Sequence, residues 1–204
     1  MSPRGVAIPD VREQLFRSAE RVLAREGAAG LSGRAITVEA GVAHGLLHNH
    51  FSDLDEFLVA FILDRARRAV ESVATLSQRA GHGTVVGNVT DAALSIEVNV
   101  PVLASLVASR PSLFLRVHEA VATGAPGLDS IEAVFAAYLD AEKQRGRVKP
   151  EADTEALAVA LVATVHHLWL TQGAGAHGEH PAGRRVIAAL LAGVADHRQD
   201  PAAP

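Results

Sequence analysis

The chain has 204 residues, a length that suits one domain or a small domain fused to a larger one. Apolar residues make up 49% of it and charged residues 21%, which is a globular composition and excludes a disordered chain. Because there is no cysteine, disulfides and thiolate metal sites are excluded, and a cytoplasmic location is expected. The net charge of −4 counts mildly against a dedicated nucleic-acid binder, since such proteins are often basic.

The first 27 residues predict a flexible arm followed by a helix. Residues 1–9 are mostly small or polar and contain two prolines, which favours the arm. Asp10 is suited to cap the helix, and Gly27 to end it in a left-handed conformation. The apolar face of this helix comprises Leu15, Phe16, Ala19, Val22 and Leu23. The opposite stripe is interpreted as a solvated face with one Glu13–Arg17 pair, and it comprises Arg17, Arg21 and Arg25.

Residues 32–77 predict three more helices, of which the first two are short. Ser32 caps a helix over residues 33–40, and Gly41 ends it because glycine adopts a left-handed conformation at little cost. A second short helix is expected over residues 43–50. Ser52 or Asp53 caps the next helix, with Glu56 three residues after Asp53 as in a capping box. That helix is expected to continue to Ser77.

The rest of the chain also predicts helices separated by loops. Residues 85–109 are apolar with Pro101 inside, so a helix with a kink near Asn99 is expected. Further helices are expected from Pro111 and over residues 128–145, 151–172 and 184–195. Glycine-rich or polar loops are expected at residues 80–84, 123–127, 146–150 and 173–183. Because no alternation typical of strands occurs, the predicted fold class is all-α, with about nine helices.

The informative feature is the pair of short helices in residues 32–51, joined by a glycine-containing turn and flanked by longer helices. A helix of one or two turns buries too little apolar surface to be stable alone. Two such helices joined by a tight turn are typical of a helix-turn-helix, which places its second helix in the DNA major groove.

The residues of this segment occur at a characteristic spacing. The residues of the pattern that precede the short helices are Leu15, Phe16, Ala19, Val22, Leu23 and Gly27. Those in the segment of the short helices are Ser32, Ile36, Ala40, Gly41, Val42, Leu47, His50 and Phe51. Those that follow are Asp55, Glu56 and Leu58. In this pattern the segment resembles the DNA-binding segment of the TetR family over about fifty residues. The resemblance implies three regions: an arm over residues 1–9, a DNA-binding domain over residues 10–52, and a ligand-binding and dimerisation domain over residues 53–204.

Several positions depart from the family pattern. The family commonly has Ser or Thr where Ala43 stands, Thr at Leu46, Tyr at His48 and Lys at Leu54. These family residues tend to touch phosphate, and phosphate contacts supply most sequence-independent affinity. Either DNA binding is weaker in this chain, or other polar residues of the second short helix compensate. The candidate DNA-binding residues are Arg34, Ala43, His44, Gly45, Leu46, His48 and Asn49.

Pairs of histidines raise the question of a metal site. His44 and His48 are four residues apart on a helix, a spacing that can bind zinc, but no carboxylate is spaced to complete the site. His166 and His167 lie in a very apolar helix, where at least one is expected to be buried and neutral. No metal and no other cofactor is therefore expected.

The family resemblance implies that the last two long helices pair with their copies across a two-fold axis. The candidate dimer residues are Leu157, Leu161, Val165, Leu168 and Trp169. An effector pocket is implied between the middle helices, and its candidate residues are Val98, Val102, Leu106, Phe114, Val117, His118, Phe135, Leu139 and His166. For every residue of both sets the alternative is a place in the protomer's own core.

Together these features predict a homodimeric transcriptional repressor that binds a palindromic, double-stranded DNA operator and is released by a small, largely apolar effector. Catalytic residues are not expected, because no nucleophile–base spacing, phosphate loop or nucleotide fingerprint occurs. No membrane segment is expected either. The alternative is a helical ligand-binding or scaffold protein of the same fold that has lost DNA binding.

Overall fold

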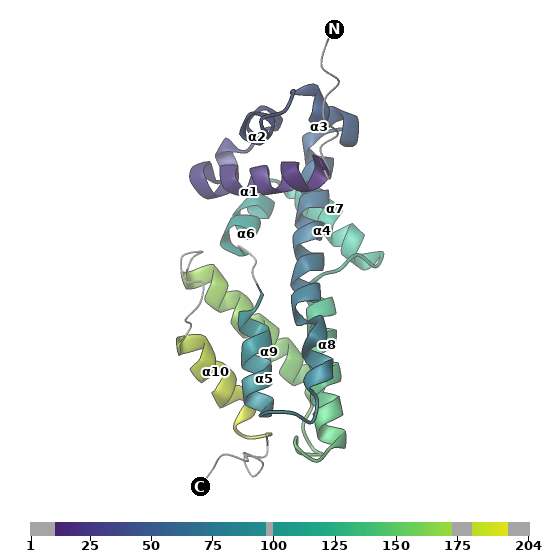
Figure 1. Ribbon diagram of the computed structural model, residues 1–204, viewed down its shortest axis with the longest axis vertical. Coiled ribbons are helices and arrows are strands. Elements are labelled where there is room, and N and C mark those ends of the chain that lie inside the picture. Colours follow the sequence, from purple (N-terminus) through teal and green to yellow (C-terminus); the bar gives the residue numbers. More distant parts are fainter. Residues whose placement is uncertain (1–10, 97–99, 173–180, 196–204) are drawn as a thin grey trace. The chain divides into compact units, whose positions relative to one another are not determined.

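The computed structural model describes residues 11–96, 100–172 and 181–195 (Figure 1). These residues form ten α-helices and one 3-10 helix, and their β-pairing is limited to one isolated bridge between Val148 and Ala195. The all-α prediction is therefore confirmed. The arm expected over residues 1–9 and the cap expected at Asp10 lie outside the described residues.

The chain divides into two compact units. Unit 1 comprises Met1–Ile62 and Val102–His118. It contains α1 (Val11–Gly30), α2 (Gly33–Ala40), α3 (Gly45–His50), the first part of α4 (Leu54–Val73), most of α6 (Val100–Ser109) and the first part of α7 (Pro111–Ala122). One apolar core joins these helices, and four of its members are the contacting rings of Phe16, Phe51, Phe57 and Phe61.

Unit 2 comprises Leu63–Pro101 and Glu119–Pro204. After the rest of α4 it contains the 3-10 helix η1 (Ala74–Arg79), α5 (Val85–Leu94), the end of α7, α8 (Leu128–Gln144), α9 (Thr154–Gln172) and α10 (Pro181–Leu191). Helix α9 packs against α5, α8 and α10 (Figure 1). Small aliphatic residues dominate the core, to which Phe135 and Tyr138 of α8 contribute the aromatic rings.

A buried polar network connects α8 with the loop that precedes α5. The carboxylate of Glu142 accepts two bonds of 2.7 Å from the Arg147 guanidinium and one of 3.2 Å from the Gly81 amide. The Arg147 guanidinium also donates to the carbonyls of His82 and Gly83. Since Glu142 is 0% exposed and Arg147 is buried, the network keeps two opposite charges paired inside unit 2.

Several predicted helix boundaries are wrong. The expected kinked helix over residues 85–109 is two helices: α5 ends at Leu94, and α6 begins at Val100 with Pro101 in its first turn, where a missing N–H costs nothing. The expected kink site, Asn99, lies outside the described residues. Gly27 has the expected positive φ of 69° but an extended ψ of −174°, and α1 resumes to Gly30.

The remaining boundaries shift by a few residues. Helix α4 ends at Val73 and continues as the 3-10 helix η1. The α-helix that was expected to reach Ser77 is therefore shorter than predicted. Helix α9 begins at Thr154 rather than at residue 151, and the Asp153 carboxylate accepts from the Ala156 amide at 3.0 Å as its cap. Helix α10 runs over Pro181–Leu191, earlier than the expected 184–195. None of the described helices is long and apolar enough to span a membrane.

Candidate nucleic-acid interface

Local signals determine where α2 begins and ends. The Ser32 hydroxyl accepts from the Ala35 amide at 3.2 Å and caps the helix, as predicted. Gly41 ends it at φ 66° and ψ 31°, a left-handed conformation that other residues adopt at a cost. The amide of Val42 then donates to the Thr37 carbonyl at 3.0 Å, so the chain turns tightly toward α3.

The two short helices are stable because their apolar sides lie in the core of unit 1. Ile36 of α2 is fully buried, as are Leu47 of α3 and Phe51 directly after it. Val42 in the turn is half-buried and packs against the same core. All four residues therefore have packing roles in unit 1. Helix α3 has six residues, and Leu47 is the one that is buried. The other side chains of α3 lie at or near the surface.

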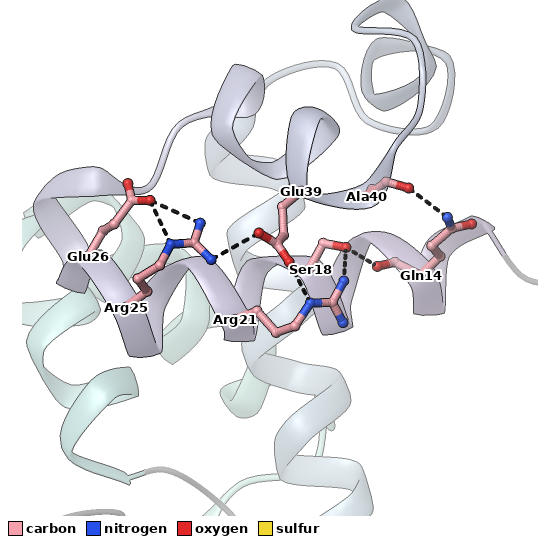
Figure 2. Close-up of polar contacts among 7 residues, drawn as sticks. All are labelled: Gln14, Ser18, Arg21, Arg25, Glu26, Glu39 and Ala40. Carbon is pink, nitrogen blue, oxygen red and sulfur yellow. Dashed lines mark hydrogen bonds and ion pairs between the residues drawn. The ribbon is translucent and has the colours of Figure 1, made fainter.

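Polar contacts hold α2 on α1 (Figure 2). The Gln14 amide donates to the Ala40 carbonyl at 2.8 Å. Arg21 and Arg25 both donate to the Glu39 carboxylate, at 2.7 and 3.0 Å. These guanidinium bonds, that of Arg21 first, hold the pKa of Glu39 below its ordinary value. The arginine stripe is solvent-exposed as predicted, but two of its members also bind the end of α2.

A further cap holds the start of α4. The Asp53 carboxylate accepts from the Glu56 amide at 2.6 Å, while the Glu56 carboxylate accepts from the Ser52 hydroxyl and amide at 2.5 and 2.7 Å. The hydroxyl bond and then the amide bond lower the pKa of Glu56. The expected capping box is thus present in a form spread over Ser52 and Asp53. These bonds fix the backbone directly after α3, at residues 52–56.

The candidate DNA-binding residues lie on the outer side of this motif. Arg34 is exposed in the first turn of α2, and Leu46 is half-buried. The candidates of the turn and of α3 that are exposed are Ala43, His44, Gly45, His48 and Asn49. A β-carbon built on Gly45 would meet no atom within 4 Å, so the backbone is open to close approach there.

Two histidine rings lie together on this outer side. The rings of His44 and His48 meet edge to face with centroids 5.6 Å apart, and His44 Nδ1 lies 3.4 Å from Thr37 Oγ1. Within the described residues, no group of three or more histidine and carboxylate side chains is arranged to hold a metal ion.

Sequence reasoning missed two features of this surface. Val38 of α2 is 72% exposed, although an apolar residue inside a short helix favours the core. The bonds of Arg21 and Arg25 to Glu39 join residues 14 to 18 positions apart on different helices. Their opposite charges were the available signal, but nothing in the sequence pairs these residues.

The candidate effector residues fall into separate clusters. In unit 1, Leu106 is buried and Val117 packs against the same core, while Phe114 and His118 stack on the exposed side of α7 with ring centroids 6.1 Å apart. Val98 and the side chain of Val102 lie outside the described residues.

Three further candidates lie in unit 2. Phe135 and Leu139 are buried in its core. His166 is half-buried, and burial lowers its pKa, whereas His167 is exposed. The expectation of a buried, neutral histidine in this helix is thus met in part by His166.

The candidate dimer residues also differ in burial. Leu161 and Val165 lie in the core of unit 2, Leu157 and Leu168 are half-buried, and the side chain of Trp169 is outside the described residues. The exposed apolar residues of α9 are instead Ala156, Val159, Ala163 and Leu170, at spacings of three, four and seven residues. Such spacing places them on one helical face.

Comparison with known proteins extends these observations. Residues 15–61 match the family model described as bacterial regulatory proteins, tetR family. No curated protein sequence matches the chain. Among solved structures, a TetR-family transcriptional regulator from Mesorhizobium loti is 15% identical, with coverage of 91% of this chain and 96% of that one and a TM-score of 0.66.

Two other solved structures are similar. SmeT, the repressor of the Stenotrophomonas maltophilia multidrug efflux pump SmeDEF, is 18% identical, with 92% of both chains covered and a TM-score of 0.63. FadR, a fatty acid degradation regulator from Bacillus halodurans, is 18% identical, with 92% of this chain and 96% of that chain covered and a TM-score of 0.65. The expected resemblance is confirmed by the match over residues 15–61 and by the fold of the described chain.

Proposed function

We propose that this protein is a homodimeric transcriptional repressor, because residues 15–61 match the model of the tetR family of bacterial regulatory proteins and the described chain has the fold of TetR-family regulators. It binds a palindromic DNA operator in the cytoplasm, and a small, largely apolar effector releases it. The DNA-binding domain is proposed over residues 10–52, after the arm, and the ligand-binding and dimerisation domain over residues 53–204.

The observation that carries the proposal is the rigid support of a very short exposed helix. Leu47 is buried, and α2 is bound to α1 through Glu39 and Ala40 (Figure 2). Side chains on rigid elements are positioned well enough to meet base edges and phosphates. Asn49, exposed on α3, is suited to bond an adenine edge, while Leu46 is suited to contact a thymine methyl group.

The exposed apolar face of α9 supports the homodimer. Val159 is 50% exposed and Leu170 is 41% exposed, although both are large and apolar. Val186 of α10 is exposed as well. In the proposed dimer these residues are covered by the second copy, with Leu157 and Leu168 at the edge of the face. Leu161 and Val165 support the face from the core of their own unit.

Effector release is proposed to act as a shift between two dimer conformations. In one, the two α3 helices stand about one DNA turn apart, roughly 34–36 Å, as two half-sites require. The effector stabilises the other. Phe135 and Leu139 provide apolar surface in unit 2, and His166, whose pKa is lowered by burial, provides a neutral polar partner.

Selection from random DNA duplexes tests DNA binding. At low salt, about 50 mM, the protein is expected to enrich a palindrome whose half-sites lie about 10–10.5 base pairs apart. Asn49→Ala is expected to weaken binding and relax one base position of each half-site. Gln78→Ala, an exposed amide of η1, is the matched control and is expected to behave as the parent. No enriched sequence at low salt would refute the repressor.

Sedimentation velocity tests the dimer. Val159→Glu places a charge in the proposed interface and is expected to yield monomers at concentrations where the parent is a dimer. Val38→Glu, at a more exposed valine of α2, is the control and is expected to leave the dimer intact. A parent protein that sediments as a monomer at all concentrations contradicts the proposed assembly.

The alternative, a ligand-binding or scaffold protein that has lost DNA binding, is favoured by one observation. Helix α3 contains no lysine or arginine, and the family's usual phosphate-binding residues are absent at Ala43, Leu46, His48 and Leu54. Phosphate contacts dominate non-specific affinity, so their loss weakens binding to every duplex. The same selection separates the two functions, because the alternative predicts a stable dimer with no enriched DNA.

A further inference from the structure

The contact between Thr37 and His44 determines which hydrogens the His44 ring offers to DNA. The Thr37 hydroxyl has one proton, and the carbonyls of Gly33 and Arg34 lie 2.9 and 3.1 Å from its oxygen. His44 Nδ1 lies farther away, at 3.4 Å. Since the proton is committed to the α2 carbonyls, Thr37 Oγ1 acts as the acceptor toward His44, and Nδ1 carries the hydrogen.

The other ring nitrogen is left for an outside partner. His44 is exposed, and its Cε1 atom lies 3.9 Å from the position of a β-carbon built on Gly33. The Nδ1–Cε1 edge of the ring thus lies along the first turns of α2. In neutral His44, Nε2 then bears a lone pair and accepts hydrogen bonds, so it cannot donate to a phosphate. Only the imidazolium presents an Nε2–H donor and a positive charge.

We propose that His44 contacts a DNA phosphate as its imidazolium form, with Thr37 as the positioning residue, so that DNA binding takes up protons. The proposal rests on the proposed function and names a phosphate contact of that same surface. The proton comes from solvent and resides on Nε2, where it is shared with a phosphate oxygen. Histidine titrates close to neutral pH, so such a contact makes affinity depend on pH in the physiological range.

The groups around His44 leave its charge available for DNA. On α2, Glu39 lies at the end opposite Gly33 and is bound by Arg21 and Arg25 (Figure 2). At the start of α4, the Glu56 carboxylate is bound to Ser52. The other charged or titratable groups of α1–α4 in this unit are Arg12, Glu13, Arg17, Glu20, Glu26, Arg34, His48, His50, Asp53 and Asp55. None of the ion pairs resolved among the described residues includes His44.

His48 limits how many protons the pair takes up. Its ring meets that of His44 edge to face at 5.6 Å, and two positive rings at that separation repel each other. The pair is therefore expected to take up about one proton per protomer when DNA binds. Arg34, in the first turn of α2, is positive at every pH of the experiment, so its contribution does not change with pH.

Fluorescence anisotropy with a labelled mixed-sequence duplex tests the proposal, because phosphate contacts are independent of sequence. The intact protein is titrated at constant ionic strength between roughly pH 5 and pH 8. Affinity is expected to rise as the pH falls, by up to about tenfold per pH unit for each proton taken up. The slope of log affinity against log salt is expected to steepen by about 0.9 for each added phosphate contact.

Variants assign the effect to His44. His44→Gln is expected to bind more weakly with little pH dependence, and His44→Arg to bind tightly across the range. Thr37→Val removes the acceptor, lets the neutral ring carry its hydrogen on Nε2, and is expected to reduce the pH dependence. His82→Gln, an exposed histidine of unit 2, is the control and is expected to keep the full pH dependence. Circular dichroism verifies that each variant is folded.

The outcomes separate this inference from the proposed function. Binding that is equally tight across the pH range overturns the protonated contact and leaves the repressor standing. A full pH dependence retained in His44→Gln also overturns it, because another group then takes up the proton. If no duplex binds at any pH at low salt, the proposed function fails and the inference fails with it.

Discussion

Replacing Arg147 tests whether the buried charge network stabilises unit 2. Arg147→Met leaves the Glu142 carboxylate, which is 0% exposed, without its two guanidinium bonds, and leaves the carbonyls of His82 and Gly83 without that donor. Breaking one partner of a buried ion pair costs about 3–5 kcal/mol. The Gly81 amide still donates to Glu142, so we expect the lower end, about 3 kcal/mol.

The loss is expected to depend on pH. Burial raises the pKa of Glu142, but the bonds from Arg147, then Tyr138 and Gly81, outweigh it and hold the pKa below its ordinary value of 4.5. In the parent, this stabilisation is fully present above pH 4.5 and is lost as the pH falls through the lower folded value. Without Arg147, burial dominates and the carboxyl protonates more easily. The difference between parent and variant is therefore largest at neutral pH and shrinks in acid.

Urea unfolding followed by tryptophan fluorescence is the assay. Trp169 is the single tryptophan of the chain and belongs to α9, a helix of unit 2. Arg145→Met, which removes an exposed guanidinium two residues away, is the control and is expected to cost less than about 1 kcal/mol. The double variant Glu142→Gln/Arg147→Met removes both charges of the network and is expected to recover part of the loss.

If Arg147→Met lowers the free energy of unfolding by less than about 1 kcal/mol at neutral pH, this reasoning is refuted. It would mean that the carboxylate finds water or another donor when Arg147 is absent. A loss equal to that of the Arg145 control would lead to the same conclusion.

Three further predictions concern the other elements. Leu47→Ala is expected to destabilise unit 1 by about 2–5 kcal/mol and to abolish DNA binding. Urea unfolding monitored by circular dichroism measures the loss of stability. An unchanged unfolding curve would contradict the role of Leu47 in holding α3 on the core. Gly41→Ala is expected to cost about 1–2 kcal/mol through its left-handed backbone alone, since a β-carbon there meets no atom within 4 Å; a neutral result would show that the turn relaxes. Because burial lowers the pKa of His166, the stability of unit 2 is expected to fall as the pH drops through 6.5, the ordinary value, and to level off below the folded value. His166→Gln removes this step, and a step that persists in the variant assigns it to another group.

The chain's own local signals predicted the helix-turn-helix well. The Ser32 cap, the residues 33–40 of α2 and the left-handed Gly41 appear in the structure as expected. These features depend on side-chain bonds within three residues and on the conformational freedom of one glycine, both of which are present in the sequence itself. The buried face of α1, which runs from Leu15 to Leu23, followed from helical periodicity in the same way.

The spacing of apolar residues did not predict which side of α9 is buried, because this helix is apolar nearly all round. Helix α9 has no continuous polar face from which to infer its orientation, so the sequence left Leu161 and Val165 as candidates for either a dimer surface or the protomer's own core. They are buried in the core of unit 2, whereas Val159 and Leu170 are exposed. Only the positions of α5, α8 and α10 around α9 decide which of its residues are covered.

Tertiary structure also decided the partners of the charged residues. Arg21 and Arg25 have the spacing of a solvated stripe, and only the approach of α2 brings Glu39 to them (Figure 2). Glu142 and Arg147 are five residues apart, yet both are buried because the loop before α5 covers them. A sequence records local bonds and the period of its apolar residues. Bonds between distant segments exist only after the chain has packed, because packing determines both their distance and their exposure to water.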